Sequence, residues 1–414
     1  MSSAPGGSTA ETRSAVGFLI ELARALHSFG SPAHRLEAAL ALMAEKLGLA
    51  GQFFSTPTAI FAYLGQGDQQ QTVLVRVEPG SVDLARLSTL EEVIGEVAEK
   101  RLSAAQAAER VRQALAEPDR WGPGITTLAF GLASAAAACF FGGGWAEIAS
   151  AGGVGLVLGA LALVAGRLPA LARVFEPGAA FLASLLAAAS AAVPAGWLLG
   201  PAAGPIVLLA GLIVLVPGLT LTVAMTELAT QHLVSGSARM AGALVKLLTL
   251  GFGSALGAWV ARPWLPAAVV QPAGLPPWVE PIALALAALG FTILFRARPA
   301  DYGWILLAAA AALEGGRLGS RLLGPQLGAF LGALLVGAGS NLFARLAHRP
   351  AAVTQLPGMM LLVPGSLGFK SIAQLVAANV EAGVEAAFAM GLVAAALVTG
   401  LLIANVLVPP KRLL

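Results

Sequence analysis

Ten stretches of about 20 apolar residues follow one another along the last two thirds of the chain, and no other feature limits the fold as strongly. Each stretch is long enough to cross a hydrocarbon core of ~30 Å as an α-helix, which rises ~1.5 Å per residue. The sequence therefore predicts an all-α polytopic membrane part. The expected spans are residues 124–144, 147–166, 178–199, 204–224, 238–260, 278–296, 302–320, 324–344, 351–371 and 384–408.

The composition favours helices in lipid over a soluble globule or a barrel. Hydrophobic residues make up 57% of the chain, charged residues only 11%, and the mean hydropathy is +0.81. A core of ordinary size cannot bury so much apolar surface. Aromatic residues are only 6%, so Ala, Leu, Val and the 49 Gly dominate, and such small and aliphatic side chains pack helix against helix in a bilayer.

The Lys and Arg residues lie singly at the ends of the apolar stretches. With the N-terminus inside, nine of them fall in inner loops and four in outer loops, in agreement with the positive-inside rule. We therefore expect a multi-pass protein of the cell membrane (inner or plasma membrane) with both termini in the cytoplasm. The chain has no dense basic run, so its net charge of +3 does not indicate nucleic-acid binding.

Residues 14–120 are predicted to form a soluble, cytoplasmic α+β domain after a disordered tail at residues 1–13. From Ala15 onward, apolar residues recur at intervals of three and four, which is one face of a helix. Gly30 is expected to end this helix. Ser31 is expected to cap the next helix through its side-chain oxygen.

Short runs rich in Phe, Val, Ile and Tyr come next. They predict a small antiparallel sheet at residues 52–55, 58–64 and 71–77. Two capping boxes then predict two more helices, the first starting at Ser88 with Glu91 and the second at Ser103 with Gln106.

The membrane part is expected to consist of two five-helix halves, residues 121–265 and residues 266–414, separated by a Pro-rich linker. Because each half has an odd number of spans, the second half enters the membrane from the opposite side, which makes the halves an inverted repeat. The tripeptide Val-Pro-Gly occurs in the fourth span of each half, starting at Val216 and at Val363.

Pro217-Gly218 and Pro364-Gly365 are expected to break their helices, because Pro removes an N–H donor and Gly relaxes the backbone. Broken helices at corresponding positions of inverted halves indicate a substrate site near the middle of the bilayer. A pair of ordinary kinks is the alternative interpretation, and the relation through the repeat argues against it. We expect the half-helix N-termini after the breaks to bind a carboxylate.

Polar side chains inside apolar spans are costly in lipid and therefore indicate function. Thr220, Thr222 and Ser366 follow the breaks and are candidates to hydrogen-bond a substrate hydroxyl. Lys246 lies deep in the fifth span, where an ammonium group needs a partner.

Glu227 and Glu314 are the candidates for carrying a coupling proton, if burial favours their protonated form. Either of them, or the carboxylate of the substrate, is an expected partner of Lys246. Glu314 has Arg317 one turn away as a further partner. The alternative interpretation is a charge that snorkels to the membrane surface.

No metal or nucleotide motif is present in the sequence, so no cofactor is predicted. The one cysteine, Cys139, excludes a disulfide within the chain, and the four His have no metal-binding spacing. The sequence GxxxxGK[ST], which would indicate direct coupling to ATP, does not occur. His27 and Ser28 leave a membrane-tethered hydrolase as an alternative, although no acid that would orient the His is identified. A channel lined by the breaks is another alternative.

Several segments resemble the threonine/serine exporter family. The first is LHSFGSPAHRLEAALALMAEKLGL from Leu26, followed by FFSTPTAIF from Phe53, and the others are VPGLTLTVAMTEL and SGSAR in the first membrane half. The resemblance covers about residues 14–408, including the order of the domains and the number of spans. It departs from the family at Glu227, where a shorter acid is expected more often.

The resemblance implies a secondary transporter, not an enzyme, that exports small hydroxy amino acids by alternating access in antiport with protons. Its partners would be a small-molecule amino acid and the lipid bilayer, and the sequence leaves a homo-oligomer open. Split two-chain members of the family are associated with dicarboxylate export. A dicarboxylate is therefore the alternative substrate.

Overall fold

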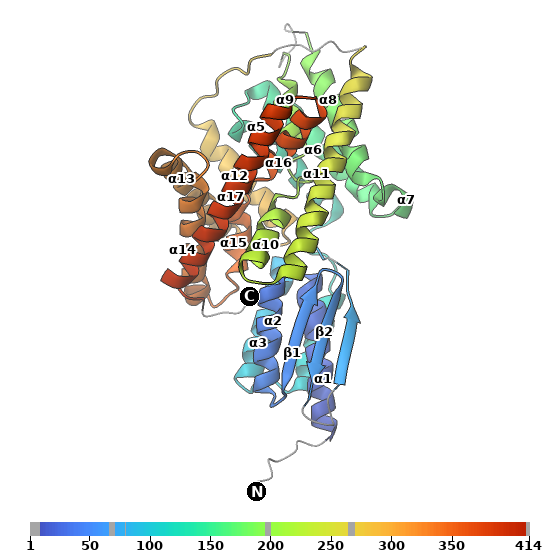
Figure 1. Ribbon diagram of the computed structural model, residues 1–414, viewed down its shortest axis with the longest axis vertical. Coiled ribbons are helices and arrows are strands. Elements are labelled where there is room, and N and C mark those ends of the chain that lie inside the picture. Colours follow the sequence, from blue (N-terminus) through green and yellow to red (C-terminus); the bar gives the residue numbers. More distant parts are fainter. Residues whose placement is uncertain (1–8, 66–70, 79, 195–199, 264–269, 411–414) are drawn as a thin grey trace.

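The computed structural model describes residues 9–65, 71–78, 80–194, 200–263 and 270–410. Figure 1 shows a bundle of helices standing on a smaller α+β part. Residues 9–118 of this smaller part are called the N-terminal unit below, residues 119–122 the connecting segment, and residues 123–410 the helical bundle.

The N-terminal unit packs four helices and a three-stranded antiparallel sheet around one core. The helix face predicted from the apolar periodicity is confirmed, because Phe18, Leu22 and Leu26 are fully buried. The predicted sheet is also confirmed, with strand order β1-β2-β3. The elements are α1 (Thr9–Ser28), α2 (Ala33–Lys46), β1 (Gly51–Thr56), β2 (Ala59–Leu64), β3 (Gln71–Arg76), α3 (Leu84–Ala98) and α4 (Ala104–Ala116).

Two expectations near the start of the chain are wrong. Helix α1 begins at Thr9, so residues 9–13 are helical rather than part of a tail, and residues 1–8 lie outside the described residues. Ser31 does not cap α2, because the N-cap residue is Pro32 and makes no side-chain cap hydrogen bond. The side-chain oxygen of Ser31 is buried without a protein partner among the described residues.

Of the two predicted capping boxes, one is present. Ser103 and Gln106 form the expected box at the start of α4. Ser88 lies inside α3, where its hydroxyl donates to the carbonyl oxygen of Leu84 at 2.8 Å. The N-cap of α3 is Asp83, whose carboxylate accepts from the backbone N–H of Arg86 at 3.0 Å and binds this donor more strongly than a hydroxyl does.

The chain is mostly helical in the bundle, and five helices are long and apolar enough to cross a membrane within the part that the structure describes: α5, α6, α11, α14 and α17. Helices α8, α10 and α12 are apolar but shorter. The elements are α5 (Pro123–Phe140), α6 (Trp145–Ala165), α7 (Pro169–Ala172), α8 (Phe175–Ala191), α9 (Gly204–Gly211), α10 (Gly218–Ala229), α11 (Leu233–Ala261), α12 (Val279–Leu294), η2 (Pro299–Asp301), α13 (Tyr302–Leu323), α14 (Gly328–Ala347), α15 (Ala352–Met359), α16 (Gly365–Val376) and α17 (Val380–Leu407).

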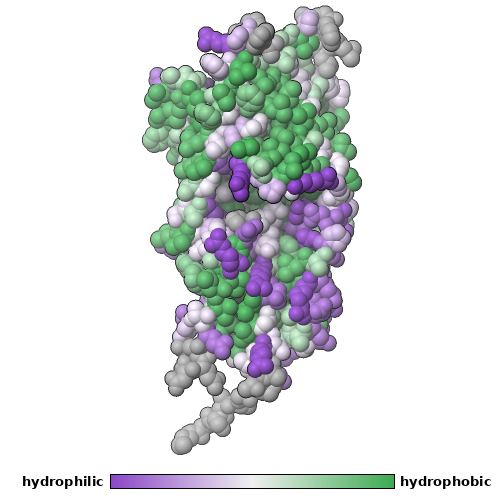
Figure 2. Space-filling model, turned by 90° about the vertical axis from the view of Figure 1, so that its right-hand side faces the viewer, coloured by the Kyte–Doolittle hydropathy of each residue, from purple (hydrophilic) through white to green (hydrophobic). Residues whose placement is uncertain are grey.

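The surface of the bundle is apolar where the surface of the N-terminal unit is mixed. Figure 2 shows hydrophobic surface over most of the bundle, both hydrophilic and hydrophobic patches over the N-terminal unit, and hydrophilic residues at the junction of the two. Phe252, Trp259 and Phe388 are each more than 60% exposed (63%, 71% and 72%). Large apolar side chains exposed in such number are unfavourable in water and suit contact with lipid.

Glycines let the helices of the bundle approach one another closely. Helix α8 packs along α11, and α14 packs along α17. A Cβ on Gly253 of α11 would overlap the carbonyl oxygen of Pro177 in α8, and one on Gly257 would lie 2.5 Å from the carbonyl oxygen of Phe181. Small residues four apart therefore form the contact surface between these two helices.

We expect Gly253→Ala to lower the melting temperature of the purified protein, because the added methyl group has no room unless α8 and α11 separate. Overpacking of this kind typically costs about 1–3 kcal/mol. Gly242→Ala on the same helix is the matched control, since a Cβ there meets nothing within 4 Å. Equal melting temperatures for the two variants would contradict this packing.

Candidate functional site

Two helices of the bundle are interrupted where the sequence predicts breaks. Residues 212–217 separate α9 from α10, and residues 360–364 separate α15 from α16. Each second half-helix starts at the glycine after a proline N-cap, which is Pro217 for α10 and Pro364 for α16. Both predicted breaks are therefore confirmed.

The two breaks contact each other. A Cβ on Gly365 would lie 2.8 Å from the Cα of Gly218, and a Cβ on Gly218 would lie 2.7 Å from Cγ2 of Val363. No side chain fits at such distances, so glycine is required at both positions. The repeated Val-Pro-Gly sequence thus marks the point where two interrupted backbones meet.

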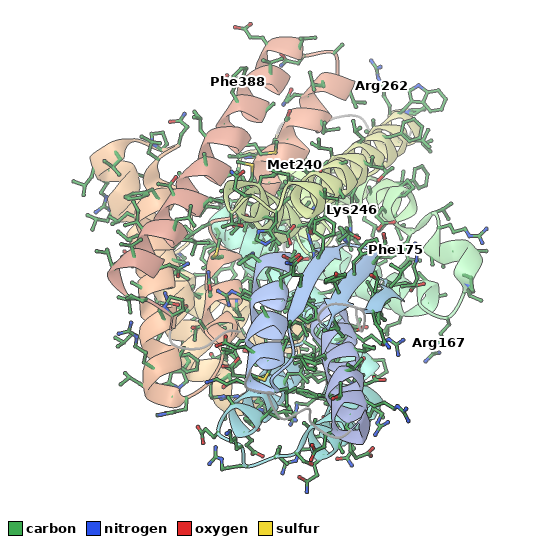
Figure 3. The ribbon with its side chains drawn as sticks, turned by 60° about the horizontal axis from the view of Figure 1, so that its bottom comes forward. Arg167, Phe175, Met240, Lys246, Arg262 and Phe388 are labelled. Atoms are coloured by element: carbon green, nitrogen blue, oxygen red, sulfur yellow. The ribbon has the colours of Figure 1, made fainter. Side chains whose placement is uncertain are left out.

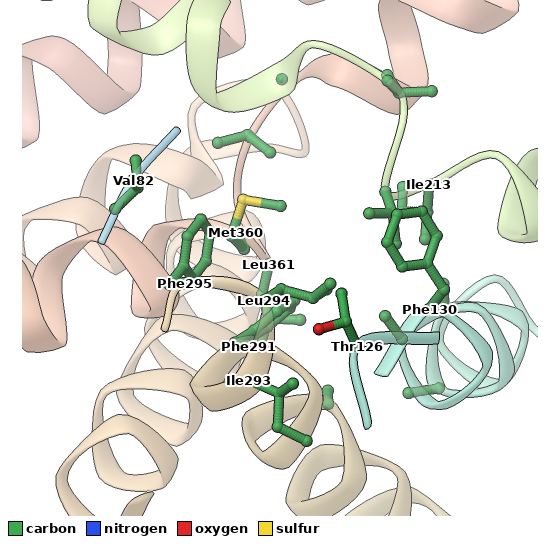
Figure 4. Close-up of a pocket in the computed structure, with 18 of the residues that line it drawn as sticks. Val82, Thr126, Phe130, Ile213, Phe291, Ile293, Leu294, Phe295, Met360 and Leu361 are labelled. Carbon is green, nitrogen blue, oxygen red and sulfur yellow. The ribbon is translucent and has the colours of Figure 1, made fainter. Parts of the chain in front are cut away.

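A cavity of about 750 Å³ opens beside the two breaks. Figure 4 shows that side chains of α5, α12 and both break segments gather around it, among them Phe130, Phe291 and Met360. Most of the wall is apolar. The cavity extends from the breaks to the N-terminal unit, which contributes Ser81 and Val82 to its lining.

Only two charged side chains line this cavity among the described residues, Asp119 of the connecting segment and Arg296 after α12. Their Oδ2 and Nη2 atoms are 3.1 Å apart. They lie where the cavity meets the N-terminal unit. We call this end of the cavity its mouth, and the end at the breaks its inner end.

The predicted substrate-binding residues fall into two groups. Gly218, Gly365 and Ser366 line the cavity, and both prolines lie directly before them. Thr220 is exposed and Thr222 is buried, and neither lines the cavity. The hydroxyl of Thr222 donates to the carbonyl oxygen of Gly218 at 3.1 Å.

Lys246 lies in the middle of α11, outside the cavity lining. Its Nζ is 3.5 Å from Oε1 of Glu176 in the first turn of α8. Figure 3 labels Lys246 and Phe175, the first residue of α8. The expectation that Glu227 or Glu314 pairs with Lys246 is wrong, because α8 packs along α11 and brings a nearer carboxylate.

Glu314 lies on an exposed face of α13, with 69% of its side chain accessible. Its expected partner is confirmed, since Arg317 donates to its Oε1 at 3.1 Å. Arg317 also pairs with Glu280 at 2.6 Å. This three-residue cluster is separate from the cavity lining.

Glu227 is fully buried where α10 meets the N-terminal unit. Its carboxylate accepts from the backbone N–H of Ala33 at 2.9 Å, from the hydroxyl of Ser235 at 2.9 Å and from Nε of Arg239 at 3.1 Å. Ala33 is the first residue of α2. A carboxylate of the helical bundle therefore caps a helix of the N-terminal unit, which is the position that the sequence assigned to Ser31.

Other polar contacts hold the N-terminal unit on the bundle around Glu227. They join residues of α2 and α3 to loops and half-helices of the bundle. The pairs are Arg35 Nη2 with Gln355 Oε1 (2.7 Å), Glu37 Oε2 with His232 Nε2 (3.3 Å), Glu92 Oε1 with Arg298 Nη1 (3.2 Å) and the Leu84 N–H with the Phe295 carbonyl oxygen (2.9 Å).

A second, small cavity of about 70 Å³ lies inside this joint. It has room for about two water molecules at ~30 Å³ each. Ser31 and His34 line it, and both carry a buried polar atom without a protein partner among the described residues. Burial and, to a smaller extent, the neighbouring charge of Arg35 together lower the pKa of His34 to about 3. The His34 ring is therefore neutral at physiological pH.

The hydrolase alternative gains no support from the geometry around His27. Nε2 of His27 lies 3.3 Å from the carbonyl oxygen of Thr56, and the ring is buried in the N-terminal unit. Burial lowers the pKa of His27. The ring thus has a structural partner in a core position, and the large cavity is elsewhere.

Sequence reasoning missed the ion pair of Asp119 with Arg296 and the pairing of Glu176 with Lys246. Asp119 and Glu176 lie just outside the apolar stretches and Arg296 is the last residue of one, so all three count only as charges at the ends of spans. The one available signal for Asp119 and Arg296 is that each lies at the end of a span expected on the inner side. Nothing in the sequence shows that these two ends meet.

A membrane part in which two broken helices meet at a cavity is the architecture of a membrane transporter. The comparison with known families agrees. A model of threonine/serine exporters matches residues 17–260, and a second one, described as "Threonine/Serine exporter, ThrE", matches residues 280–407. The chain belongs to the threonine/serine exporter family.

Curated relatives of the chain include fungal proteins named "Pheromone-regulated membrane protein 10". The one from Candida albicans is 27% identical over 370 residues, which are 86% of this chain and 33% of the relative. The one from Yarrowia lipolytica is 28% identical over 374 residues (87% and 30%), and the one from Eremothecium gossypii 27% over 364 residues (86% and 48%). The chain thus spans less than half the length of these relatives. No solved structure matches it.

We expect Glu227→Gln to lower the melting temperature of the full chain far more than Glu314→Gln does. The amide cannot neutralise Arg239 and caps Ala33 less well, and breaking a buried ion pair typically costs about 3–5 kcal/mol. Glu314 is 69% exposed, and such surface pairs are worth about 0–1 kcal/mol. Thermal unfolding in detergent measures both, and equal shifts would show that the Glu227 cap does not stabilise the joint.

Stability should fall as the pH drops from about 6.5 towards 3, and His34→Gln should make this fall less steep. The pKa of His34 is lowered to about 3 in the folded chain from 6.5, so between these values the unfolded chain binds a proton that the folded chain does not. Melting temperatures at pH 7 and pH 5 measure the difference. His348→Gln, at an exposed position, is the control. Its melting temperature should change between pH 7 and pH 5 by as much as that of the unmodified chain.

Proposed function

We propose that this chain is a secondary transporter that exports small amino acids of the threonine/serine kind by alternating access, with the substrate held between the two broken helices. The observation that carries the proposal is the cavity of about 750 Å³, whose lining includes Gly218, Gly365 and Ser366 at both breaks. The family supplies the substrate class.

Helix α16 offers the better carboxylate site at the inner end of the cavity. Its first residues, Gly365 and Ser366, line the cavity, and a helix N-terminus carries partial positive charge and N–H groups without intrahelical acceptors. At α10, the N–H of Gly218 already donates to the carbonyl oxygen of Val216 at 2.8 Å. The hydroxyl of Ser366 is placed to bond the substrate, whereas that of Thr222 is already used.

The correspondence of the two halves supports an inverted repeat. The first half-helices α9 and α15 have 8 residues each, and the second half-helices α10 and α16 have 12 each. The last helices of the halves, α11 and α17, have 29 and 28 residues. We therefore propose ten crossings in two inverted halves that rock about the breaks, with both termini and the N-terminal unit in the cytoplasm.

Glu227 is a better candidate for proton coupling than Glu314. It lies in the last turn of the half-helix α10, which begins at a break, whereas Glu314 lies on an exposed face of α13. Protonation of Glu227 would remove its charge beside Arg239 and weaken the cap on α2. Proton uptake would then favour a different position of α10. Lys246 pairs with Glu176 outside the cavity, so it has no part in the proposed substrate site.

Counterflow in proteoliposomes tests the proposal. Vesicles that contain the purified full chain and are loaded with unlabelled L-threonine should transiently accumulate labelled threonine, whereas a channel only equilibrates the label. An imposed proton gradient should drive net threonine movement if protons are coupled. If vesicles loaded with unlabelled succinate accumulate labelled succinate, while threonine-loaded vesicles do not accumulate labelled threonine, the dicarboxylate alternative is correct. If neither substrate shows counterflow, the proposed export of both classes is wrong.

Accessibility of position 366 gives a second test of the substrate site. In a Cys139→Ala background, Ser366→Cys should react with a water-soluble maleimide, and L-threonine should slow the reaction, because Ser366 lines the cavity. Thr220→Cys is the control, since Thr220 is exposed but outside the lining, and threonine should leave its labelling rate unchanged. Unprotected labelling at position 366 would place the substrate elsewhere.

A further inference from the structure

The mouth of the cavity carries a cluster of four charged side chains. Asp119 and Arg296 face the cavity, and Asp83 and Arg86 of the N-terminal unit stand behind them. The rest of the lining is uncharged among the described residues. The cavity thus presents one carboxylate and one guanidinium, 3.1 Å apart, at the end where a substrate from the side of the N-terminal unit arrives.

We propose that Asp119 and Arg296 form a zwitterion-binding site at the mouth, in which Asp119 binds the ammonium group of an amino acid and Arg296 binds its carboxylate. An arginine matches a carboxylate with two parallel N–H donors, and a carboxylate is the strongest acceptor for an ammonium group. The inference rests on the proposed function and narrows it. The site selects molecules that carry both charges over molecules that carry only carboxylates.

The exposure of the four groups separates them into a pair that can bind and a pair that supports it. The side chains of Asp119 and Arg296 are 51% and 33% exposed, whereas those of Arg86 and Asp83 are 13% and 4% exposed. An ion pair in contact with water contributes little to stability. A substrate can therefore separate Asp119 from Arg296 without a large loss.

Each outer charge keeps a second partner when the substrate separates the pair. Nη1 of Arg296 lies 3.9 Å from Oδ2 of Asp83, and Nη1 of Arg86 lies 3.8 Å from Oδ1 of Asp119. Arg86 and Asp83 are themselves 3.5 Å apart. The exchange of partners on binding therefore leaves no buried charge without a partner. Breaking an ion pair is costly only when it leaves such a charge unpaired.

Hydrogen bonds from the N-terminal unit and the connecting segment to backbone carbonyl groups of the bundle fix the mouth. The N–H of Ala85 donates to the carbonyl oxygen of Arg296 at 3.3 Å, and Nε1 of Trp121 donates to the carbonyl oxygen of Ala297 at 3.2 Å. Figure 4 shows Val82 of the N-terminal unit on the same side of the cavity as Phe295. The N-terminal unit thus supplies part of a substrate site and does not merely cover the bundle.

A dicarboxylate fits this mouth less well than a zwitterion. Its first carboxylate can bind Arg296, but its second one meets the carboxylate of Asp119. Like charges placed together in a partly desolvated site reject a partner more strongly than a missing contact does. The mouth therefore favours amino acids among the substrates associated with the family.

Serine and glycerate provide the test, because they differ only in an ammonium group against a hydroxyl at the central carbon. In counterflow with the full chain, we expect the unmodified protein to prefer serine by about tenfold or more in kcat/KM, as is typical of a charge-assisted bond. Asp119→Asn should raise the KM for serine about tenfold and bring the preference close to one, with kcat nearly unchanged. Arg296→Gln should weaken both substrates equally and keep the preference.

Glu92→Gln and Arg298→Gln are the matched controls. Glu92 and Arg298 form an ion pair of 3.2 Å in the same joint, and neither lines the cavity. Arg298 is two residues after Arg296 in the chain. Both variants should keep the KM for serine and the preference over glycerate. Stabilisation of each purified variant by serine or glycerate, measured as a shift in melting temperature, gives a binding readout that does not depend on transport.

Asp119→Asn with an unchanged KM and an unchanged preference would overturn the inference, as would a control variant that loses the preference to the same extent. Counterflow of serine by the unmodified chain without preference over glycerate would also overturn the site at the mouth, but would leave the proposed export function standing. Absence of both serine counterflow and serine stabilisation in the unmodified chain would refute the export function and the site together.

Discussion

The backbone contact between Gly218 and Gly365 determines the centre of the bundle. Two helices of the bundle are interrupted at this point, so four half-helices meet there. The space that two continuous helices would fill is open to the cavity. A Cβ on Gly365 would lie 2.8 Å from the Cα of Gly218, so even alanine would push the breaks apart. The shape of the inner end therefore depends on two residues that have no side chain.

Helix α10 connects this contact to the N-terminal unit. It begins at Gly218 and contains Glu227 in its last turn, whose carboxylate caps α2 at Ala33. The cap replaces a group that α2 lacks, because Pro32 makes no side-chain bond and the hydroxyl of Ser31 has no protein partner. A rigid helix of 12 residues thus has a cavity at one end and a buried joint at the other.

The sequence predicted most features that depend on neighbouring residues, with the caps assigned to Ser31 and Ser88 as exceptions, and missed those that depend on distant residues. The break at Pro217, the capping box at Ser103 and the sheet follow from local rules, and the structure contains them. The cap from Glu227 to Ala33 joins residues 194 positions apart. Lys246 likewise pairs with Glu176 through helix packing. A charged side chain within an apolar segment indicates that a partner is needed, but only the packing of the helices determines which group is that partner.

The lining between the mouth and the breaks is mostly apolar, and both charged side chains of the described lining lie at the mouth. A zwitterion loses strong bonds to water when it leaves solution, so it needs compensating groups wherever it rests. In the proposed transport path, Asp119 and Arg296 would provide them at the mouth, and the N-terminus of α16 at Gly365 would provide them at the inner end. Polar side chains along the wall would hold the substrate between these places and slow its passage. Phe130 and Phe291 offer no polar partner, so the proposed path has its resting places at the two ends.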